Sequence, residues 1–365
     1  MSESLEQHLH RLSTTETPLA LPESNGRLRC VACGHRCILK DGMRGVCKVR
    51  WMEGGKLHVP WGYAAGIQND PIEKKPYFHA FPGVKALSFG MLGCDFKCAY
   101  CQNWVTSQAL RDPVAGVEPE EVTPDEIADI AIRAGSRVVV STYNEPLITA
   151  EWAVDVFKAA RARGLATGFV SNGNATPEVL DFLKPHCDIY KVDLKAFSQK
   201  NYRELGGRLD HVLETISSLV DRGFWVEIVT LLVPGWNDSD EELTGLTEFI
   251  ASVSPLIPWH VTAYHPDYHM QDHVRTGPRH LVRAAEIAVK AGLRFIYPGN
   301  LPGQVGNWED TRCHRCGETV IRRTGFRVLE NRLGRGGECP GCREPVPGFW
   351  ENGLVPVKPV SRAAA

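Results

Sequence analysis

Short apolar runs alternate with longer amphipathic stretches over residues 85–299. Runs such as SRVVVST and WVEIVTLLV are typical of buried strands, whereas stretches in which apolar residues recur every three or four positions are typical of helices. Seven strands are predicted, at residues 85–92, 136–142, 166–172, 189–195, 225–233, 259–265 and 293–299. Six helices are predicted, at residues 123–135, 147–164, 176–186, 211–223, 238–253 and 279–292.

The predicted boundaries carry residues that begin and end helices. Thr123 and Glu126 stand on either side of Pro124 in the pattern of a capping box with proline at the first helical position. Because strands that alternate with helices form parallel βαβ units, the region predicts an α/β fold. Six or more units indicate a full or partial barrel, with a doubly wound open sheet as the competing arrangement. Either arrangement binds its ligands at the carboxyl ends of the strands.

Composition narrows the possible partners. The chain has 365 residues, of which 43% are hydrophobic, so it is long enough to bury a large core. Its 41 basic and 43 acidic residues give a formal net charge of -2, which favours neither nucleic acid nor an anionic membrane as a partner. No run approaches the roughly 20 apolar residues of a membrane span, and the polar first residues do not resemble a signal peptide. A cytoplasmic protein is therefore expected.

Cysteine-rich segments flank the predicted α/β core. The predicted organisation is a polar N-terminal segment, a four-cysteine metal-binding module, the core, a zinc-ribbon-like module and a C-terminal tail, at residues 1–29, 30–82, 83–310, 311–350 and 351–365. The chain has 12 cysteines. In a chain without an export signal these favour thiolate ligation over disulfides, because cytoplasmic reductants keep thiols reduced.

Three cysteines, Cys94, Cys98 and Cys101, follow the first predicted strand in the stretch GCDFKCAYCQNW. Zinc sites and iron–sulfur cubanes normally take four protein ligands, so three thiolates leave one position open at the ligand-binding edge of the fold. A four-iron cluster with one unligated iron could bind a small chelating molecule and pass it an electron. A zinc site completed by a remote ligand is the alternative.

This C-x3-C-x2-C motif, with Tyr100 before its last cysteine, resembles the signature of the radical S-adenosylmethionine superfamily. The resemblance implies that the three cysteines hold a [4Fe-4S] cluster whose open iron is chelated by S-adenosylmethionine (SAM). Reductive cleavage of SAM would yield a 5'-deoxyadenosyl radical that abstracts hydrogen. The resemblance also implies a partial (β/α)6 TIM-like barrel, in agreement with the number of predicted strands.

Other segments make the resemblance more specific. DPIEKKPYFHAFPG, STYNEP, LLVPGWND and WHVTAYHPDY are similar to the group related to pyruvate formate-lyase activating enzyme. Together with the two cysteine-rich flanks, they resemble the radical enzyme of the AmmeMemoRadiSam system.

The resemblance assigns residues near the ends of the strands to SAM. Glu145 would receive the SAM ammonium in the segment Tyr143-Asn144-Glu145-Pro146, where relatives usually carry Gly-Gly-Glu-Pro, although side chains at 143 and 144 adopt unusual backbone angles less readily than glycine does. The other expected cofactor contacts are Tyr100, Asn144, Ser171, Asn172, Asp193, Lys195, Leu232 and His260. Purely structural alternatives stay open: an Asn-Gly turn at 172, a buried ion pair between Asp193 and Lys195, and packing for Leu232 and His260.

Two further cysteine sets predict metal sites. Cys313, Cys316, Cys339 and Cys342 form two C-x2-C pairs separated by a strand-rich segment, which is the spacing of a zinc ribbon. At the other end of the core, a tetrahedral zinc site or an auxiliary [4Fe-4S] cluster could be held by Cys30, Cys33, Cys37 and Cys47. The spacing of this N-terminal set does not decide between them, and zinc is the preferred interpretation.

The leading hypothesis is a radical SAM enzyme that acts on an unidentified substrate. A glycyl-radical-enzyme activase is the nearest alternative, and a zinc-dependent protein-interaction scaffold is the alternative of another class. A radical enzyme needs a reductant protein of the flavodoxin or ferredoxin type. The resemblance adds AMMECR1-like and Memo-like proteins as possible partners.

Overall fold

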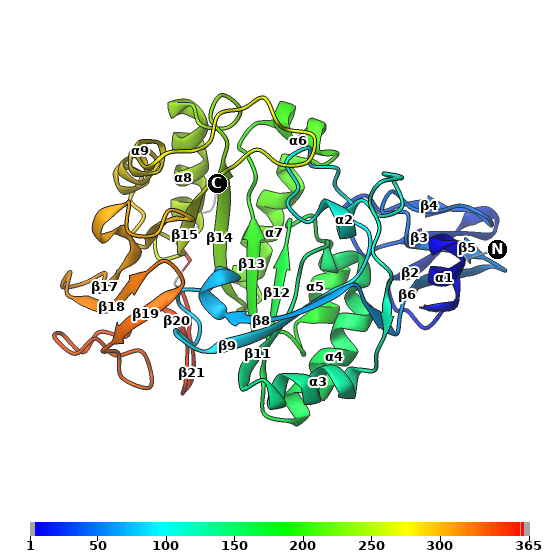
Figure 1. The fold of residues 1–365 in the computed structure, drawn as a ribbon, viewed down its shortest axis with the longest axis horizontal. Coiled ribbons are helices and arrows are strands. Elements are labelled where there is room, and N and C mark those ends of the chain that lie inside the picture. The colour runs from blue at the N-terminus through cyan, green and yellow to red at the C-terminus, as the bar shows by residue number, and fades with distance from the viewer. Residues whose placement is uncertain (1–3, 358, 361–365) are drawn as a thin grey trace. The chain divides into compact units, whose positions relative to one another are not determined.

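The computed structural model describes residues 4–357, 359 and 360 of the chain (Figure 1). The chain divides into two compact units. Unit 1 comprises the chain up to Asp70 with Lys85–Asp188 and Arg203–Thr215, and unit 2 comprises Pro71–Val84, Ile189–Tyr202 and the chain from Ile216 onward. Each unit therefore combines segments that are far apart in the sequence.

Unit 1 is built on parallel strands. In spatial order they are β12 (Ala166–Ser171), β11 (Ser136–Ser141) and β9 (Lys85–Gly90), with β8 (Gly66–Pro71) beside β9. The three central valines of β11 are fully buried, as expected of a strand covered on both faces. Helices α3 (Pro124–Arg133) and α4 (Ala150–Ala162) contact each other and β11, and α5 (Pro177–Leu183) follows β12.

Small antiparallel sheets form the N-terminal part of unit 1. Its elements are α1 (Leu5–Arg11), β1 (Ser13–Thr14), β2 (Ala20–Glu23), β3 (Arg27–Cys30), β4 (Ile38–Leu39), β5 (Trp51–Glu53), β6 (Lys56–Pro60), β7 (Tyr63–Ala64), β10 (Glu120–Glu121) and α2 (Trp104–Ser107). The strands pair in the orders β1-β6-β5, β2-β3-β4 and β10-β7. Although these strands are short, they contribute buried apolar side chains such as Leu57, Val59 and Tyr63.

Unit 2 contains the remaining parallel strands. In spatial order they are β13 (Ile189–Asp193), β14 (Trp225–Leu232), β15 (Trp259–Ala263) and β16 (Ile296–Gly299). Helices α8 (Asp240–Val253) and α9 (Pro278–Lys290) contact each other, and α9 also contacts β15 and β16. The division between the units falls within α6 (Gln199–Leu205) and α7 (Leu209–Asp221).

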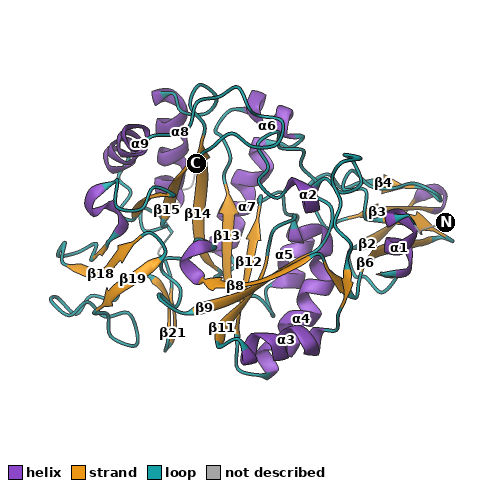
Figure 2. Cartoon of the chain, viewed as in Figure 1, coloured by secondary structure: helices purple, strands orange, loops and turns teal. Residues whose placement is uncertain are grey.

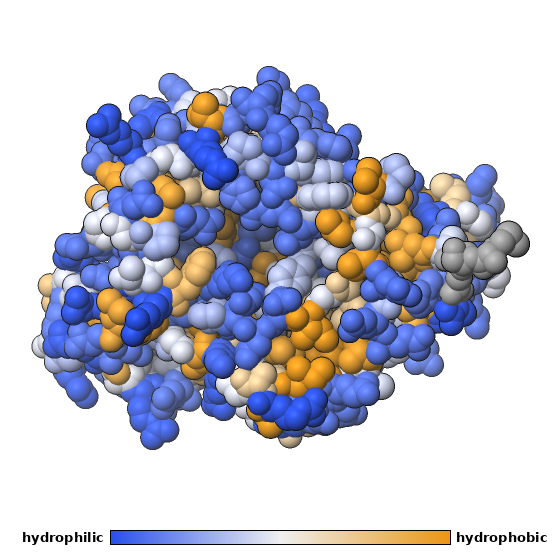
Figure 3. Space-filling view, in the orientation of Figure 1, coloured by the Kyte–Doolittle hydropathy of each residue, from blue (hydrophilic) through white to orange (hydrophobic). Residues whose placement is uncertain are grey.

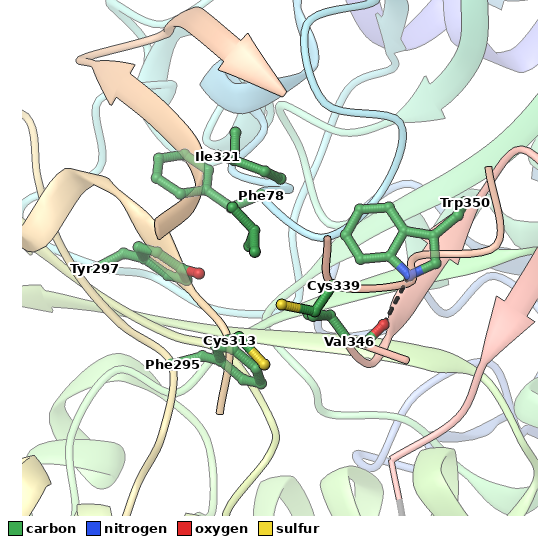
Figure 4. Packing of buried hydrophobic residues seen from close by; sticks show 9 residues of the cluster. Phe78, Phe295, Tyr297, Cys313, Ile321, Cys339, Val346 and Trp350 are labelled. Carbon is green, nitrogen blue, oxygen red and sulfur yellow. Dashed lines mark hydrogen bonds between the residues drawn. The ribbon is translucent and has the colours of Figure 1, made fainter. Parts of the chain in front are cut away.

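The C-terminal part of unit 2 packs on the start of β16. Its strands are β17 (Thr311–Arg312), β18 (Thr319–Thr324), β19 (Arg327–Asn331), β20 (Gly348–Trp350) and β21 (Gly353–Val355). One apolar cluster joins Phe78, Phe295, Tyr297, Cys313, Val320, Ile321, Cys339, Val346 and Trp350 (Figure 4). The indole nitrogen of Trp350 donates to the carbonyl oxygen of Val346 at 2.8 Å, so the polar end of this buried ring is also satisfied.

The secondary structure confirms an α/β fold with all seven predicted strands and all six predicted helices (Figure 2). The capping box of Thr123 and Glu126 is formed, with Pro124 at the start of α3. The fourth helix of the chain begins at Ala150 and not at 147, because Pro146–Thr149 forms a 3-10 turn. Closure of a (β/α)6 barrel and the bounds of the five predicted segments stay predictions.

Hydrophilic residues cover most of the molecular face seen in Figure 3, with apolar residues in scattered patches. Among the residues that the structure describes, no helix is both long enough and apolar enough to cross a membrane.

Candidate active site

The three central cysteines lie on the loop between β9 and α2. Cys98 and Cys101 are joined by a turn in which the amide nitrogen of Cys101 donates to the carbonyl oxygen of Cys98 at 3.2 Å. The sulfur of Cys94 accepts from the amide nitrogen of Phe96 at 3.4 Å, and that of Cys101 lies 3.2 Å from the hydroxyl of Ser107. The loop thus presents three thiols at the carboxyl end of β9, where the sequence predicted them.

Packing inside unit 1 fixes the shape of this loop. The fully buried ring of Phe96 lies against Gly207, where an added Cβ would stand 2.5 Å from Cε1 of the ring. The Arg111 guanidinium donates to the carbonyl oxygens of Cys94 and Phe96, both at 2.7 Å. Because both carbonyls flank Asp95, Arg111 holds the first half of the motif in one conformation.

Tyr143 adopts the backbone conformation that glycine would supply in relatives. Its φ is 73°, in the left-handed region that L-residues rarely occupy. Asn144 supports the turn, because its side-chain oxygen accepts from the amide nitrogen of Met91 at 3.1 Å. The turn therefore forms with a tyrosine in an unfavourable backbone conformation. Glu145 follows two residues later.

Glu145 is held by residues from two parts of unit 1. Its carboxylate accepts from the amide nitrogen of Leu147 at 3.0 Å, the hydroxyl of Ser171 at 2.8 Å and the amide nitrogen of Asn172 at 2.7 Å. Three of the predicted cofactor residues, Glu145, Ser171 and Asn172, are thus brought together after β11 and β12. Tyr100 is buried within the cysteine loop.

Asp95 is a second buried carboxylate in the same region, and sequence reasoning missed it. It accepts from the side-chain amides of Asn172 at 2.7 Å and Asn174 at 2.8 Å. Asp95 and Glu145 are 1% and 2% exposed, and within the described part of the chain neither forms an ion pair. The sequence feature that could have identified Asp95 is its position as a charged residue between Cys94 and Cys98.

Two buried carboxyl groups, Asp95 and Glu145, stand in this site without an ion-pair partner among the described residues. Burial, followed by the charge of Asp95, raises the pKa of Glu145 above its ordinary range, despite three donated hydrogen bonds. Burial also raises the pKa of the Cys94 thiol, with further contributions from Asp95 and Glu145. A bound cation with hydrogen-bond donors would stabilise the ionised form of Glu145. The arrangement therefore fits a cationic ligand beside a thiolate-bound metal.

Four other expected cofactor residues lie in unit 2, and three of them are Asp193, Lys195 and Leu232. Asp193 forms ion pairs with Lys191 and with Lys195, the latter at 3.5 Å. Burial acts to raise the pKa of Asp193, but the two lysines together lower it. Leu232, the last residue of β14, is fully buried. An ion pair and a packed leucine are the structural alternatives, and contacts of these residues with SAM stay predictions.

His260 takes part in a buried network at the start of β15. Its Nε2 lies 2.7 Å from a carboxylate oxygen of Glu227, and its ring packs edge-on against Phe78. Glu227 also accepts from the amide nitrogens of Phe78 and His79, both at 2.9 Å. His260 thus has the partners of a packed core histidine, and its contact with SAM stays a prediction. Glu227 was missed, although it is the lone charge in the run WVEIVTLLV.

The C-terminal cysteines form a compact group. Their four sulfur atoms lie within 4.8 Å of one another, with Cys313 3.6 Å from Cys342 and Cys316 3.6 Å from Cys339. A tetrahedral zinc ion with bonds of about 2.3 Å places its sulfur ligands about 3.8 Å apart. The four residues, hereafter the C-terminal cysteine group, therefore fit a single metal ion.

Comparison with known proteins identifies the family. The model of the radical SAM superfamily matches residues 90–246, a range that includes the cysteine loop and Glu145. An uncharacterized protein of Methanocaldococcus jannaschii is 35% identical over 301 residues, which cover 82% of this chain and 88% of that protein. This chain belongs to the radical SAM superfamily.

Two other proteins that are similar to this radical SAM protein are activating enzymes by name. Pyruvate formate-lyase 1-activating enzyme of Escherichia coli is 28% identical over 195 residues, which cover 50% of this chain and 77% of that enzyme. A solved domain of pyruvate-formate lyase-activating enzyme from Bacteroides vulgatus is 21% identical, with a TM-score of 0.40, and the match covers 44% of this chain and 98% of that one.

Membership of the superfamily makes this protein an enzyme of the radical SAM class. The superfamily implies a [4Fe-4S] cluster and SAM. The residues present fit these groups, because three thiols stand beside two buried carboxylates that lack a cation. A zinc-dependent scaffold without redox chemistry is not supported by this membership.

Proposed function

We propose that this enzyme reductively cleaves SAM at a [4Fe-4S] cluster held by Cys94, Cys98 and Cys101. The 5'-deoxyadenosyl radical formed from SAM would then abstract hydrogen from a substrate that the chain does not identify. The observation that carries the proposal is the position of the cysteine loop at the carboxyl end of β9, beside Asp95 and Glu145. A cluster with an open iron and a cationic ligand would satisfy both features.

Unit 1 supplies the groups for the amino acid part of SAM. Glu145 would accept hydrogen bonds from the SAM ammonium. Burial and Asp95 raise the pKa of its carboxyl group, so a bound cation would stabilise the ionised form. Ser171 and Asn172 position this carboxylate through their hydrogen bonds. Asp95 would add a second negative charge near the cationic ligand. Its two carboxylate oxygens accept hydrogen bonds from Asn172 and Asn174.

Among radical SAM systems we favour the AmmeMemoRadiSam type, with AMMECR1-like and Memo-like proteins as partners. The support is the pattern of two cysteine modules around the core. A glycyl-radical activase is the second candidate, favoured by the 28% identity to an activating enzyme over half of this chain. Either function draws electrons from a flavodoxin or ferredoxin type of reductant, which suits the cytoplasm.

We also propose that the C-terminal cysteine group holds structural zinc. Its sulfur spacing of 3.6 Å supports one tetrahedral ion, and closed four-thiolate coordination stabilises segments too small to form a core of their own.

Formation of 5'-deoxyadenosine tests the main proposal. Protein purified without oxygen and reduced with dithionite should convert SAM to 5'-deoxyadenosine and methionine, as measured by liquid chromatography and mass spectrometry. Cys98→Ala should abolish this product and lower the iron content. Cys187→Ala, which removes a buried cysteine outside the three sets, is the matched control and should retain both. Cleavage that persists in Cys98→Ala would refute the assignment.

A further inference from the structure

We propose that Cys30, Cys33, Cys37 and Cys47, the N-terminal cysteine set, hold a second iron–sulfur cluster that exchanges electrons with the catalytic one. The inference deepens the proposed function and rests on it for the identity of the catalytic cluster. It replaces the zinc interpretation that the sequence preferred. Four observations in unit 1 support it.

The fold first gathers these four thiols. The amide nitrogen of Cys30 donates to the carbonyl oxygen of Cys37 at 2.9 Å. A Cβ added at Gly45 would lie 3.6 Å from the sulfur of Cys37 and 3.8 Å from that of Cys47. Burial raises the pKa of Cys33, with further contributions from the charges of Asp95, Cys30 and Cys47. The fold thus brings together four thiols, of which Cys30, Cys33 and Cys47 are buried and Cys37 is half-buried.

The second observation is the wider spacing of these thiols. The sulfur atoms of the C-terminal cysteine group all lie within 4.8 Å of one another, as one tetrahedral ion requires. Among the described residues, the thiols of the N-terminal cysteine set do not form a group compact enough to hold a single metal ion in this way. In a [4Fe-4S] cluster each thiolate binds a different iron atom, so its ligands stand further apart than those of a single ion. The same chain thus shows two different spacings, and the wider one suits a cluster.

The third observation is a buried donor beside the set. Arg50 is 1% exposed and forms a two-point ion pair with Glu151, with both N–O distances at 2.8 Å. Its Nη1 also donates to the carbonyl oxygen of Ile148 at 3.1 Å, whereas its Nε–H has no hydrogen-bond partner among the described residues. Burial acts to lower the pKa of Arg50, but the charges of Cys30, Glu151 and Cys47 together raise it. A buried N–H without a partner costs free energy, and the sulfur atoms of a cluster would accept it. Hydrogen bonds to these sulfurs also tune the reduction potential.

The fourth observation is contact with the catalytic loop. A Cβ added at Gly93, whose φ is 90°, would lie 3.1 Å from the carbonyl oxygen of Cys47. One nitrogen of Arg111 donates both to the carbonyl oxygen of Val46 at 2.6 Å and to that of Cys94 at 2.7 Å. The segment of Cys47 therefore leaves no room for a side chain at position 93, and the carbonyls of Val46 and Cys94 share one guanidinium. A cluster on the N-terminal cysteine set would stand next to the catalytic cluster.

The electron balance is simple. A flavodoxin or ferredoxin type of reductant gives one electron to the second cluster, which becomes reduced and then passes that electron to the catalytic cluster. The second cluster returns to its oxidised state, and the electron is consumed when the carbon–sulfur bond of SAM breaks. No further oxidant or reductant is required.

Metal analysis of the full chain, purified without oxygen, tests the inference. Two clusters require about eight iron atoms per chain, beside zinc. A variant with alanine at Cys94, Cys98 and Cys101 should keep about four of them, with a dithionite-reduced paramagnetic signal that SAM does not alter. This variant leaves the N-terminal cysteine set intact, so it does not depend on whether changes in that set permit folding. A variant that holds zinc and no iron would overturn the inference.

The two proposals fail in different ways. If wild-type protein holds about four iron atoms and forms 5'-deoxyadenosine, while the triple variant holds none, the proposed function stands and the second cluster does not. If wild-type protein forms no 5'-deoxyadenosine although the triple variant keeps its iron, the proposed function fails and the second cluster stands.

Electron paramagnetic resonance tests the contact between the clusters. In fully reduced wild-type protein, the two paramagnets should broaden and split each other's signals. Cys37→Ala removes the one half-buried thiol of the set, and it should abolish this splitting while leaving the SAM-sensitive signal of the catalytic cluster. A wild-type spectrum equal to the sum of the two variants' spectra would refute electron exchange at close range. Cys187→Ala again serves as the control and should keep the splitting.

Discussion

Replacement of Glu145 by glutamine isolates the role of its charge in binding SAM. Glutamine has nearly the same size, and its side-chain oxygen can still accept from the donors at Leu147, Ser171 or Asn172. What disappears is a hydrogen bond between an ammonium and a buried carboxylate, which contributes about 1.5–3 kcal/mol. Since every 1.4 kcal/mol is a factor of about ten in affinity, Glu145→Gln should weaken SAM binding by about 10- to 100-fold.

The pH dependence gives an independent signature of the same residue. Burial and Asp95 raise the pKa of Glu145 in the ligand-free enzyme, so part of the population is protonated near neutral pH and cannot pair with the ammonium. SAM affinity of the wild-type enzyme should therefore increase as the pH rises toward that raised pKa. Folding shows the opposite sign: the ligand-free protein loses stability as the pH rises from the ordinary carboxyl range through the raised pKa. Glu145→Gln should show neither dependence.

The assay is anaerobic calorimetric titration of cluster-loaded enzyme with SAM from pH 6 to 8.5, beside urea unfolding over the same range. Glu118→Gln removes an exposed carboxylate and is the matched control, which should follow the wild type. An affinity that does not change with pH in the wild type, or a glutamine variant that binds SAM as tightly as the wild type, would refute the assignment of Glu145 to the ammonium.

Three further perturbations test the supports of the site. Gly207→Ala should force the Phe96 ring to move, destabilise the fold by about 1–3 kcal/mol and lower the iron content. The control is Gly116→Ala, at an exposed position where an added Cβ meets no atom within 4 Å, and its free energy of unfolding should stay within about 0.5 kcal/mol of that of the wild type. Urea unfolding and iron analysis measure both variants, and equal effects would contradict the packing argument. Arg50→Met should cost about 3–5 kcal/mol because it leaves the buried carboxylate of Glu151 without its cation, with the hydroxyl of Thr17 still donating to it. The double variant with methionine at both positions should recover most of that loss, and a double variant less stable than the single one would contradict the reasoning. Removal of metal from the C-terminal cysteine group by a thiol-reactive mercurial and chelator should make residues 311–350 sensitive to proteases, as read by mass spectrometry; unchanged digestion would argue against a structural ion.

The strands and helices of the core could be predicted because each is encoded locally. Buried parallel strands such as β11 are continuous apolar runs, and α3 begins at a capping box whose members are three residues apart. The cysteine loop could be predicted for the same reason, since all of its ligands lie within eight residues.

Contacts between distant segments could not be predicted. Glu145 and Ser171 were expected as separate contacts of SAM, and only the fold shows that one accepts from the other across 26 residues of sequence. Tyr143 has a φ of 73° because the surrounding turn imposes it, against the preference of its own side chain. The position of Asp95 is fixed by hydrogen bonds from Asn172 and Asn174. These asparagines lie far from the cysteine motif in the sequence, so the motif alone does not predict the contacts.

Two members of the C-terminal cysteine group, Cys313 and Cys339, also belong to the apolar cluster that contains Tyr297 of β16 and Trp350 of β20 (Figure 4). An ion lost from these sulfurs would loosen core side chains, not merely a peripheral segment. Chains that open more often are removed faster by cellular proteases, and about 1–2 kcal/mol is enough to change abundance several-fold. Metal supply would then set the lifetime of each molecule and the number of copies in a cell, while leaving the chemistry of the surviving copies unchanged.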